Sequence, residues 1–244
     1  MRNSWFRFKE FTIIQEHSAM KVSTDACIQG AWAASLIQSR FQRNSTEETH
    51  LLDIGTGTGL LSLMLAQILA NCKIDAIEAE PTAAQEAAYN FEASKWSDAL
   101  SVQQTTLQQF ETDKQYDFII CNPPFFHKHL QAPDIARNKA RHDIGLSKEE
   151  LAFHAHRLLA DGGLLCVMYP ATEWDAWLKA AAGKGFKRVA QLDIVPASNK
   201  PANRVVAFFS LQKNITPTQE ILHIRDAENS YTKAFQEMMQ PYYL

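Results

Sequence analysis

The sequence predicts an α/β fold: a mostly parallel sheet of seven strands with helices on both faces and an antiparallel pair of strands at one edge. From about residue 50 onward, short apolar runs alternate with helical patterns, which is typical of a parallel sheet covered by helices. The chain has 244 residues, of which 46% are hydrophobic and 21% charged, so it can form one domain with a sizeable core. Within that domain we expect a flank and a helix covering the active site over 1–49, a core over 50–212 and a C-terminal extension over 213–244.

Each expected strand is an apolar run bounded by turn or helix signals. These runs occupy residues 50–54, 73–78, 100–104, 116–121, 164–169, 189–195 and 205–211. No helical pattern separates the last two runs. Because parallel neighbours need a long crossover connection, we expect these two to be the antiparallel pair.

Capping residues and proline place the helices between the strands. Ser23 can cap a helix that runs to about Gln38, and Pro81 stands where a helix tolerates proline. Ser147 and Glu150 form a capping box, and we expect the glycines of 161–163 to end that helix. The expected helices cover residues 24–38, 59–70, 81 onward, 148–160, 171–182 and 230–239.

Three glycines, Gly55, Gly57 and Gly59, lie between the first strand of this core and the helix after it. Glycine permits positive φ and close backbone approach, and a helix N-terminus offers free N–H donors, so we expect a ligand across this turn. Asp53 precedes the glycines, and a carboxylate there would repel a pyrophosphate but suit a cationic amino-acid group. Glu78 ends the second strand, where an acid can accept hydrogen bonds from ribose hydroxyls. The pattern favours S-adenosylmethionine (AdoMet) over a nicotinamide dinucleotide or an empty turn.

A proline-rich turn, Asn122–Phe125, follows the fourth expected strand. Two consecutive prolines stiffen the backbone, which fixes the Asn122 side chain and the Pro123 carbonyl as two hydrogen-bond acceptors. A conjugated amine is a poor nucleophile, and two acceptors on its N–H bonds would aim its lone pair at a methyl donor. Phe125 offers a flat face on which a base can stack.

Together these motifs resemble those of the class I amino-methyltransferases, which have a Rossmann-like fold. The motifs are Asp53–Gly59, Glu78 and Asn122–Phe125. The proline-rich tetrapeptide is shared by adenine-N6, cytosine-N4 and glutamine-N5 enzymes, so it indicates a chemistry and not a substrate.

The flanks resemble one branch, the bacterial tRNA1(Val) adenine-N6-methyltransferases. The likeness lies in Phe8–Phe11, Ala19–Asp25 and Gly30–Ala33, with Ser23 where that family usually has glycine. It continues through Arg204–Val206 and Tyr231–Leu244. The resemblance implies methylation of N6 of adenosine 37 in tRNA1(Val), with AdoMet as donor and S-adenosylhomocysteine as product.

The resemblance also implies roles for particular residues. Asn122, Pro123, Pro124 and Phe125 would hold the target adenine. The family commonly has an acid just after the third strand, and Thr106 stands there instead, so the cofactor's adenine contact would come from Thr106 or the backbone near Leu107. The residues implied to bind AdoMet are Lys21, Asp25, Asp53, Gly55, Thr56, Gly57, Gly59, Glu78, Thr106, Leu107 and Asn122.

Basic residues suggest where RNA would bind. A segment rich in lysine and arginine follows the proline-rich turn directly, and its phosphate contacts would position RNA beside the site. Its candidates are Lys128, Arg137, Lys139 and Arg141. A second basic group, expected near the sheet edge, comprises Lys184, Lys187, Arg188, Lys200 and Arg204. The net charge of −3 argues against binding over the whole surface.

Metal, membrane and secretion signals are weak. The pair His154 and His156 has no third ligand at metal spacing, and the four cysteines are scattered. No run approaches the roughly 20 apolar residues of a membrane span, and the first residues lack the apolar region of a secretory signal. We therefore expect a cytoplasmic monomer that binds tRNA and neither metal nor membrane.

Two other functions stay open on the residues alone. Methylation of a protein glutamine uses the same tetrapeptide, although that family usually has a larger N-terminal helical domain than the segment before residue 50. A non-catalytic module that binds AdoMet or RNA is the other alternative, and the intact tetrapeptide argues against it.

Overall fold

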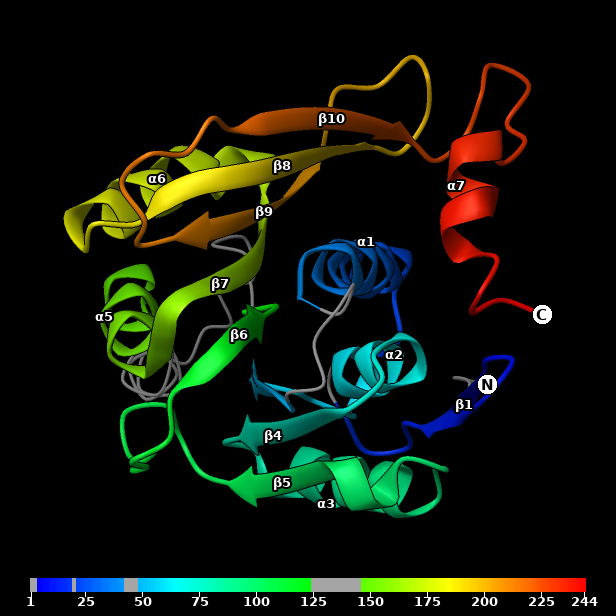
Figure 1. The fold of residues 1–244 in the computed structure, drawn as a ribbon. Helices are drawn as coiled ribbons and strands as arrows, with labels where there is room; N and C mark the ends of the chain where they lie inside the picture. Colours follow the sequence, from blue (N-terminus) through cyan, green and yellow to red (C-terminus); the bar gives the residue numbers. More distant parts are fainter. Residues whose placement is uncertain (1–3, 19–20, 42–47, 124–145) are drawn as a thin grey trace, which may run out of the picture.

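The computed structural model describes residues 4–18, 21–41, 48–123 and 146–244. Its central sheet has eight strands. Their order across the sheet is β10 (Thr218–His223), β8 (Lys187–Val195), β9 (Arg204–Ser210), β7 (Leu159–Pro170), β6 (Tyr116–Cys121), β3 (Thr49–Ile54), β4 (Cys72–Glu78) and β5 (Leu100–Gln104) (Figure 1). All neighbours are parallel except β9, which is antiparallel to both β7 and β8.

The α/β class, the mostly parallel sheet and the antiparallel pairing of β8 with β9 are confirmed. The expected count of seven strands was one too few, and β8 is not at the edge because β10 lies outside it. In β10 only Leu222 is buried, so this strand lacks the alternation of apolar and polar residues that predicts a strand. The strand also lies beyond residue 212, where we expected the core to end.

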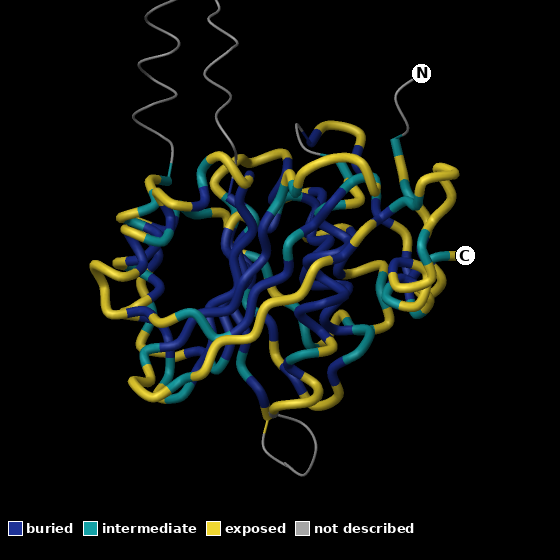
Figure 2. The backbone as a smooth tube through the Cα atoms, turned by 90° about the horizontal axis from the view of Figure 1, so that it is seen from above, coloured by how far each residue is buried: buried dark blue, intermediate teal, exposed yellow. Residues whose placement is uncertain are grey.

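Helices cover both faces of the sheet. Successive residues of a buried strand point to opposite faces, and here Leu51 and Leu52 belong to two separate clusters of apolar side chains. One cluster includes helices α1 (Thr24–Phe41), α2 (Leu60–Ile68), α3 (Pro81–Glu92) and α7 (Lys233–Met239). The other includes α5 (Lys148–Leu158) and α6 (Trp174–Gly183). Figure 2 shows buried segments of the chain at the centre, with intermediate and exposed residues around them.

Local signals predicted most helix starts. Ser23 Oγ accepts from the Ala26 N–H at 3.2 Å, Pro81 opens α3, and the capping box of Ser147 with Glu150 opens α5. The expected end of α5 at residues 161–163 was wrong, because the helix ends at Leu158. Gly162, with φ 79°, lies instead within β7, next to a register shift against β6. Short 3-10 turns, η1 (Ser97–Ala99) and η2 (Ala171–Glu173), precede β5 and α6.

The two flanks of the chain pack against each other. Strands β1 (Trp5–Arg7) and β2 (Thr12–Ile14), which we did not predict, form a hairpin beside the C-terminal tail. The Lys9 N–H donates to the Tyr242 carbonyl at 2.8 Å, and the Tyr242 hydroxyl donates to the Met64 carbonyl at 3.2 Å. Both flanks therefore lie on the face that α1 and α2 cover, and Figure 1 shows β1 on the same side of the molecule as α7.

Candidate active site

The carboxyl ends of three adjacent strands bring the predicted site residues together. Ile54 of β3 pairs with Ile77 of β4 on one side and with Cys121 of β6 on the other. Gly55, Glu78 and Asn122 are the next residues along their strands, so they lie at the same edge of the sheet. The chain passes from β3 outward to β4 and β5 and then returns to β6, which makes this edge the switch point where such sheets bind ligands.

The glycine loop after β3 exposes its backbone on one side. Gly55, Gly57 and Gly59 all have positive φ, at 68°, 58° and 85°. A Cβ atom added at Gly55 or Gly57 would meet nothing within 4 Å, whereas one at Gly59 would lie 2.4 Å from the Phe91 ring. The first two glycines thus leave open space beside the backbone, and the third permits α2 to pack against α3.

Asp53 is fully buried directly below this loop. Its Oδ2 atom accepts hydrogen bonds from the Thr56 hydroxyl at 2.6 Å and the Ser62 hydroxyl at 2.7 Å. Its Oδ1 atom is buried and accepts no hydrogen bond from the described residues. Desolvation raises the pKa of this carboxyl group to about 6 in spite of those bonds. A buried carboxylate with one free oxygen fits a cationic ligand, which would offset the desolvation cost.

Glu78 joins the end of β4 to the glycine loop. Its Oε2 accepts from the Gly57 N–H at 2.8 Å, and its Oε1 accepts from the Glu80 N–H at 2.9 Å. Each carboxylate oxygen can accept a second hydrogen bond, so the side chain can hold the loop and still receive ribose hydroxyls.

Thr106 and Leu107 follow β5, beside Glu78. The Thr105 N–H donates to the Glu78 carbonyl at 2.9 Å, which fixes the start of this turn. Thr106 Oγ1 accepts from the Gln109 N–H at 3.3 Å, and the Leu107 side chain is buried in the cluster on the α5 side of the sheet. The Thr106 hydroxyl therefore caps a turn, and the Leu107 side chain contributes to packing.

Asn122 begins the proline-rich turn. Its Oδ1 atom is buried and accepts no hydrogen bond from the described residues, and Pro123 is buried. The expected partners Pro124 and Phe125 lie outside the described residues, as do Lys128, Arg137, Lys139 and Arg141. The described part of the turn therefore presents one unused acceptor beside the glycine loop.

Asp25, expected near the cofactor, lies in the first turn of α1, and Lys21, also expected there, precedes the helix. Asp25 Oδ2 forms an ion pair with Arg204 Nε at 3.2 Å, and Arg204 pairs with Pro170 at the carboxyl end of β7. Desolvation raises the pKa of Asp25, and Arg204 opposes that shift. Lys21 Nζ donates to the Gln15 carbonyl at 3.1 Å. Asp25 therefore lies at the carboxyl edge of the sheet, the same edge as the glycine loop.

Two polar residues of α3, missed in the sequence, connect the N-terminal flank to the site. Asn90 Oδ1 accepts from the Ile14 N–H at 2.9 Å, and Asn90 Nδ2 donates to the Ile14 carbonyl at 3.0 Å and the Thr58 carbonyl at 2.9 Å. Glu86 accepts from the backbone N–H groups of His17, at 2.6 Å, and Ser18, at 3.0 Å. The four-residue spacing of Glu86 and Asn90 puts both on one helix face, which was the available signal.

Comparisons with known proteins show the family to which this chain belongs. A family model described as the methyltransferase small domain matches residues 32–184. The chain belongs to the methyltransferase small domain family. A tRNA1(Val) (adenine(37)-N6)-methyltransferase of Vibrio campbellii is 35% identical to this methyltransferase, over 98% of this chain and 95% of the relative. An enzyme of the same name from Dyadobacter fermentans is also 35% identical, over 100% of this chain and 98% of the relative.

A solved structure shares the fold of this methyltransferase. The crystal structure of a predicted O-methyltransferase from Agrobacterium tumefaciens superimposes with a TM-score of 0.66. The match covers 88% of this chain and 95% of the other, with 14% sequence identity. It confirms the expected class I methyltransferase architecture.

The second basic group of the methyltransferase does not form one surface. Lys187 and Arg188 start β8, opposite the end of β9, whereas Arg204 starts β9 opposite Ile194. The seven residue steps from Lys187 to Ile194 separate these ends by roughly 23 Å. Of this group, only Lys200 and Arg204 lie near the carboxyl edge of the sheet.

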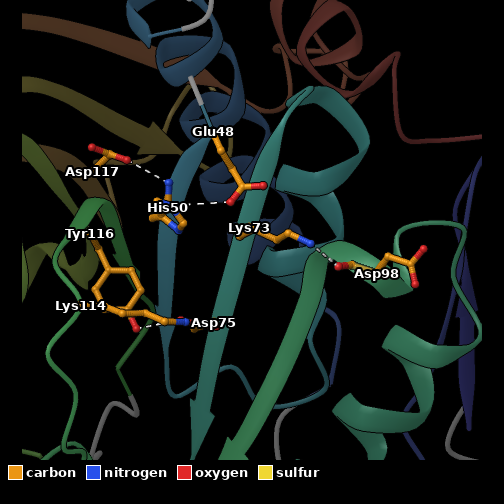
Figure 3. Close-up of polar contacts among 8 residues, drawn as sticks. All are labelled: Glu48, His50, Lys73, Asp75, Asp98, Lys114, Tyr116 and Asp117. Atoms are coloured by element: carbon orange, nitrogen blue, oxygen red, sulfur yellow. Dashed lines mark hydrogen bonds and ion pairs between the residues drawn. The ribbon is translucent and has the colours of Figure 1, made fainter. Parts of the chain in front are cut away.

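A separate charged cluster occupies the opposite, amino end of the sheet (Figure 3). Lys114 Nζ lies 2.7 Å from Asp75 Oδ2, and the Tyr116 hydroxyl donates to the same oxygen at 2.9 Å. Burial raises the pKa of Asp75, but hydrogen bonds from Lys114, Ser101 and Tyr116 outweigh it and hold that pKa below its usual value. These contacts connect β4, β5 and the start of β6, so the cluster is structural.

Features of a metal site or a membrane span are absent from the described ranges. These ranges contain no group of three or more histidine, cysteine, aspartate or glutamate residues that could hold a metal ion. No helix in those same ranges is both long and apolar enough to cross a membrane.

Proposed function

We propose that this chain transfers the methyl group of AdoMet to N6 of adenosine 37 in tRNA1(Val). One observation carries the proposal: at the end of β6, beside the open glycine loop, Asn122 Oδ1 is a buried acceptor that receives no hydrogen bond from the residues the structure describes. A buried acceptor without a partner costs free energy unless a ligand supplies a donor, and an exocyclic amine does so. The names of the relatives from Vibrio campbellii and Dyadobacter fermentans support the choice of substrate.

The loop residues fit AdoMet, and we propose that they hold it. Asp53 Oδ1, which accepts no hydrogen bond from the described part of the chain, and the backbone of Gly55, Thr56 and Gly57 would receive its methionine end. Glu78 would accept its ribose hydroxyls. When bound, AdoMet supplies an electrophilic methyl group on a sulfonium.

Other residues would complete the cofactor site. The turn at Thr106 and Leu107 would meet the adenine of AdoMet, and Gly59 would hold the loop in shape. Lys21 and Asp25 would close the mouth of the site from the start of α1. The positions of Thr106, Leu107 and Asp25 at one edge of the sheet support their roles, and the resemblance in sequence supports that of Lys21.

The chemistry requires little more than positioning. Asn122 Oδ1 would accept one N6–H bond and the Pro123 carbonyl the other, which favours a pyramidal nitrogen and directs its lone pair. A proton leaves the nitrogen after methylation, when it has become acidic, so no strong base is required beforehand. Precise placement of reacting groups alone can supply about 7–11 kcal/mol of the barrier.

The segment after Pro123 would complete the substrate site. Pro124 and Phe125 would hold the base, and Lys128, Arg137, Lys139 and Arg141 would contact phosphates of the RNA. We further propose that the unit over 50–212 carries the reaction, that the flanks over 1–49 and 213–244 pack on it, and that the enzyme acts as a cytoplasmic monomer.

A comparison of two substrates tests this proposal against glutamine methylation. Purified enzyme receives labelled AdoMet and either an unmodified tRNA1(Val) transcript or a release factor. We expect label in the tRNA only, and none in a transcript with guanosine at position 37. Label in the protein alone would contradict the proposal, and binding of AdoMet without any transfer would favour a non-catalytic module.

A further inference from the structure

One buried side chain of α1 lies against the proposed catalytic turn. Gln29 has no exposed surface, and among the described side chains of α1 it is the only buried polar one. Its helix neighbours Ile28 and Ala33 are buried apolar residues. Burying an amide among such side chains is unfavourable unless its groups are hydrogen-bonded, so we expect a specific partner for Gln29.

Gln29 Nε2 donates to the carbonyl oxygen of Cys121 at 3.0 Å and lies 3.9 Å from Cys166 Sγ. Cys121 is the last residue of β6, and its carbonyl belongs to the peptide group that connects it to Asn122. The orientation of that peptide plane sets where the Asn122 side chain begins. Pro123 has no N–H, so the next peptide group of the turn cannot donate to hold it.

We propose that Gln29 is a positioning residue for Asn122: its amide fixes the Cys121–Asn122 peptide and thereby the acceptor of the target amine. The inference rests on the proposed function, and it adds a residue of α1 to a site otherwise built from strand ends. Holding a reacting group within a fraction of an ångström matters, because a shift of about 1 Å can reduce the rate about 100-fold.

The cofactor loop has a comparable support from a different helix. Asn90 of α3 donates to the Thr58 carbonyl in that loop. Two buried amides thus hold the two halves of the site separately. Loss of Gln29 should impair the transfer step and leave AdoMet affinity intact, because its hydrogen bonds among the described residues go to Cys121 and Cys166 and not to the glycine loop.

The chain offers a matched control in Gln67 of α2. Gln67 Nε2 also donates to a backbone carbonyl, that of Pro241 at 2.6 Å, and the Oε1 atoms of Gln67 and Gln29 are both buried without a described partner. Gln67 connects α2 to the C-terminal tail and does not touch the turn. Gln29→Met and Gln67→Met therefore remove the same kind of bond at two places.

The experiment compares kcat, KM for tRNA, AdoMet affinity by calorimetry and thermal unfolding for both variants. We expect Gln29→Met to lower kcat about 10- to 100-fold, with AdoMet affinity within about twofold of the wild type, and Gln67→Met to keep the wild-type kcat. Gln29→Glu keeps the shape, and burial favours its neutral form, which can still donate to Cys121. Its kcat should lie between those of the wild type and Gln29→Met.

Hydrogen exchange gives a readout that needs no substrate. In Gln29→Met, but not in Gln67→Met, the peptide covering 116–123 should exchange faster, because the Cys121–Asn122 peptide group has lost its hydrogen bond from Gln29. An unchanged kcat and unchanged exchange in Gln29→Met would overturn the inference, as would an equal loss of kcat in both variants. A wild-type enzyme that fails to methylate tRNA would instead contradict the proposed function, and the exchange data would still decide the role of Gln29.

Discussion

The carboxylate of Glu78 accepts a hydrogen bond of 2.8 Å from the backbone N–H of Gly57. This contact joins the end of β4 to the loop that follows β3, and the second carboxylate oxygen accepts from the Glu80 N–H. Glu78 therefore holds the glycine loop in its open shape, and we propose that it also accepts the ribose hydroxyls of AdoMet.

Glu78→Gln should weaken AdoMet binding about 10- to 100-fold, because an amide has only one oxygen and cannot serve both N–H groups. Calorimetric titration of AdoMet measures this. Glu80→Gln is the matched control, since Glu80 caps α3 by accepting from the Ala83 N–H at 2.7 Å and does not touch the loop. Equal affinities for the wild type and Glu78→Gln would remove Glu78 from the cofactor site.

Asp53 should make AdoMet binding depend on pH. Its pKa is raised to about 6, so the free protein carries a neutral Asp53 at pH 5 and a charged one at pH 7. A cationic ligand prefers the charged form, and we expect the affinity to fall about tenfold from pH 7 to pH 5. Asp53→Asn should bind weakly at both pH values. A wild-type affinity that does not change over this range would contradict the role of the Asp53 charge.

The raised pKa of Asp53 also predicts how the free energy of unfolding changes with pH. A carboxyl group whose pKa rises from 3.8 to about 6 on folding destabilises the folded state as pH rises through that interval, by about 2–3 kcal/mol above pH 6. Asp53→Asn should thus raise the free energy of unfolding at pH 7.5, and the gain should vanish toward pH 4. Urea unfolding without ligand at both pH values checks this, and a variant that is less stable at pH 7.5 would refute it.

Asn90→Ala should lower both stability and AdoMet affinity, because three hydrogen bonds that connect β2, α3 and the glycine loop are lost. We expect about 2–4 kcal/mol less free energy of unfolding. Glu86→Gln is the control: Glu86 holds His17 and Ser18 but does not touch the loop. It should lower stability and leave AdoMet affinity unchanged. An Asn90→Ala variant with wild-type affinity would show that the flank does not support the cofactor loop.

Where sequence signals are local, they predicted the structure well. The runs 100–104 and 116–121 match β5 and β6, and the capping box opens α5 where expected. The edge strand β10 escaped prediction because it buries only Leu222, and the hairpin of β1 and β2 because each strand has three residues. A strand of three residues is too short to show an alternating pattern, and an exposed strand has too few buried residues to show one.

Only the part of the candidate site that follows strand ends could be predicted from the sequence. Asp53, the glycines and Asn122 could be found because they lie directly at strand ends. The bonds of Gln29 to Cys121 and of Asn90 to Thr58 join residues far apart in the chain, and they exist only once α1 and α3 are packed. A lone polar residue on an apolar helix face is the only trace that such a contact leaves in a sequence.

The central claim is tested most directly by mass spectrometry of nucleosides from tRNA1(Val) of a strain that lacks this gene. We expect N6-methyladenosine at position 37 to disappear, to return with the wild-type gene and not to return with Asn122→Ala. In vitro, that variant should still bind AdoMet. Undiminished N6-methyladenosine in the deletion strain, or full restoration by Asn122→Ala, would contradict the central claim.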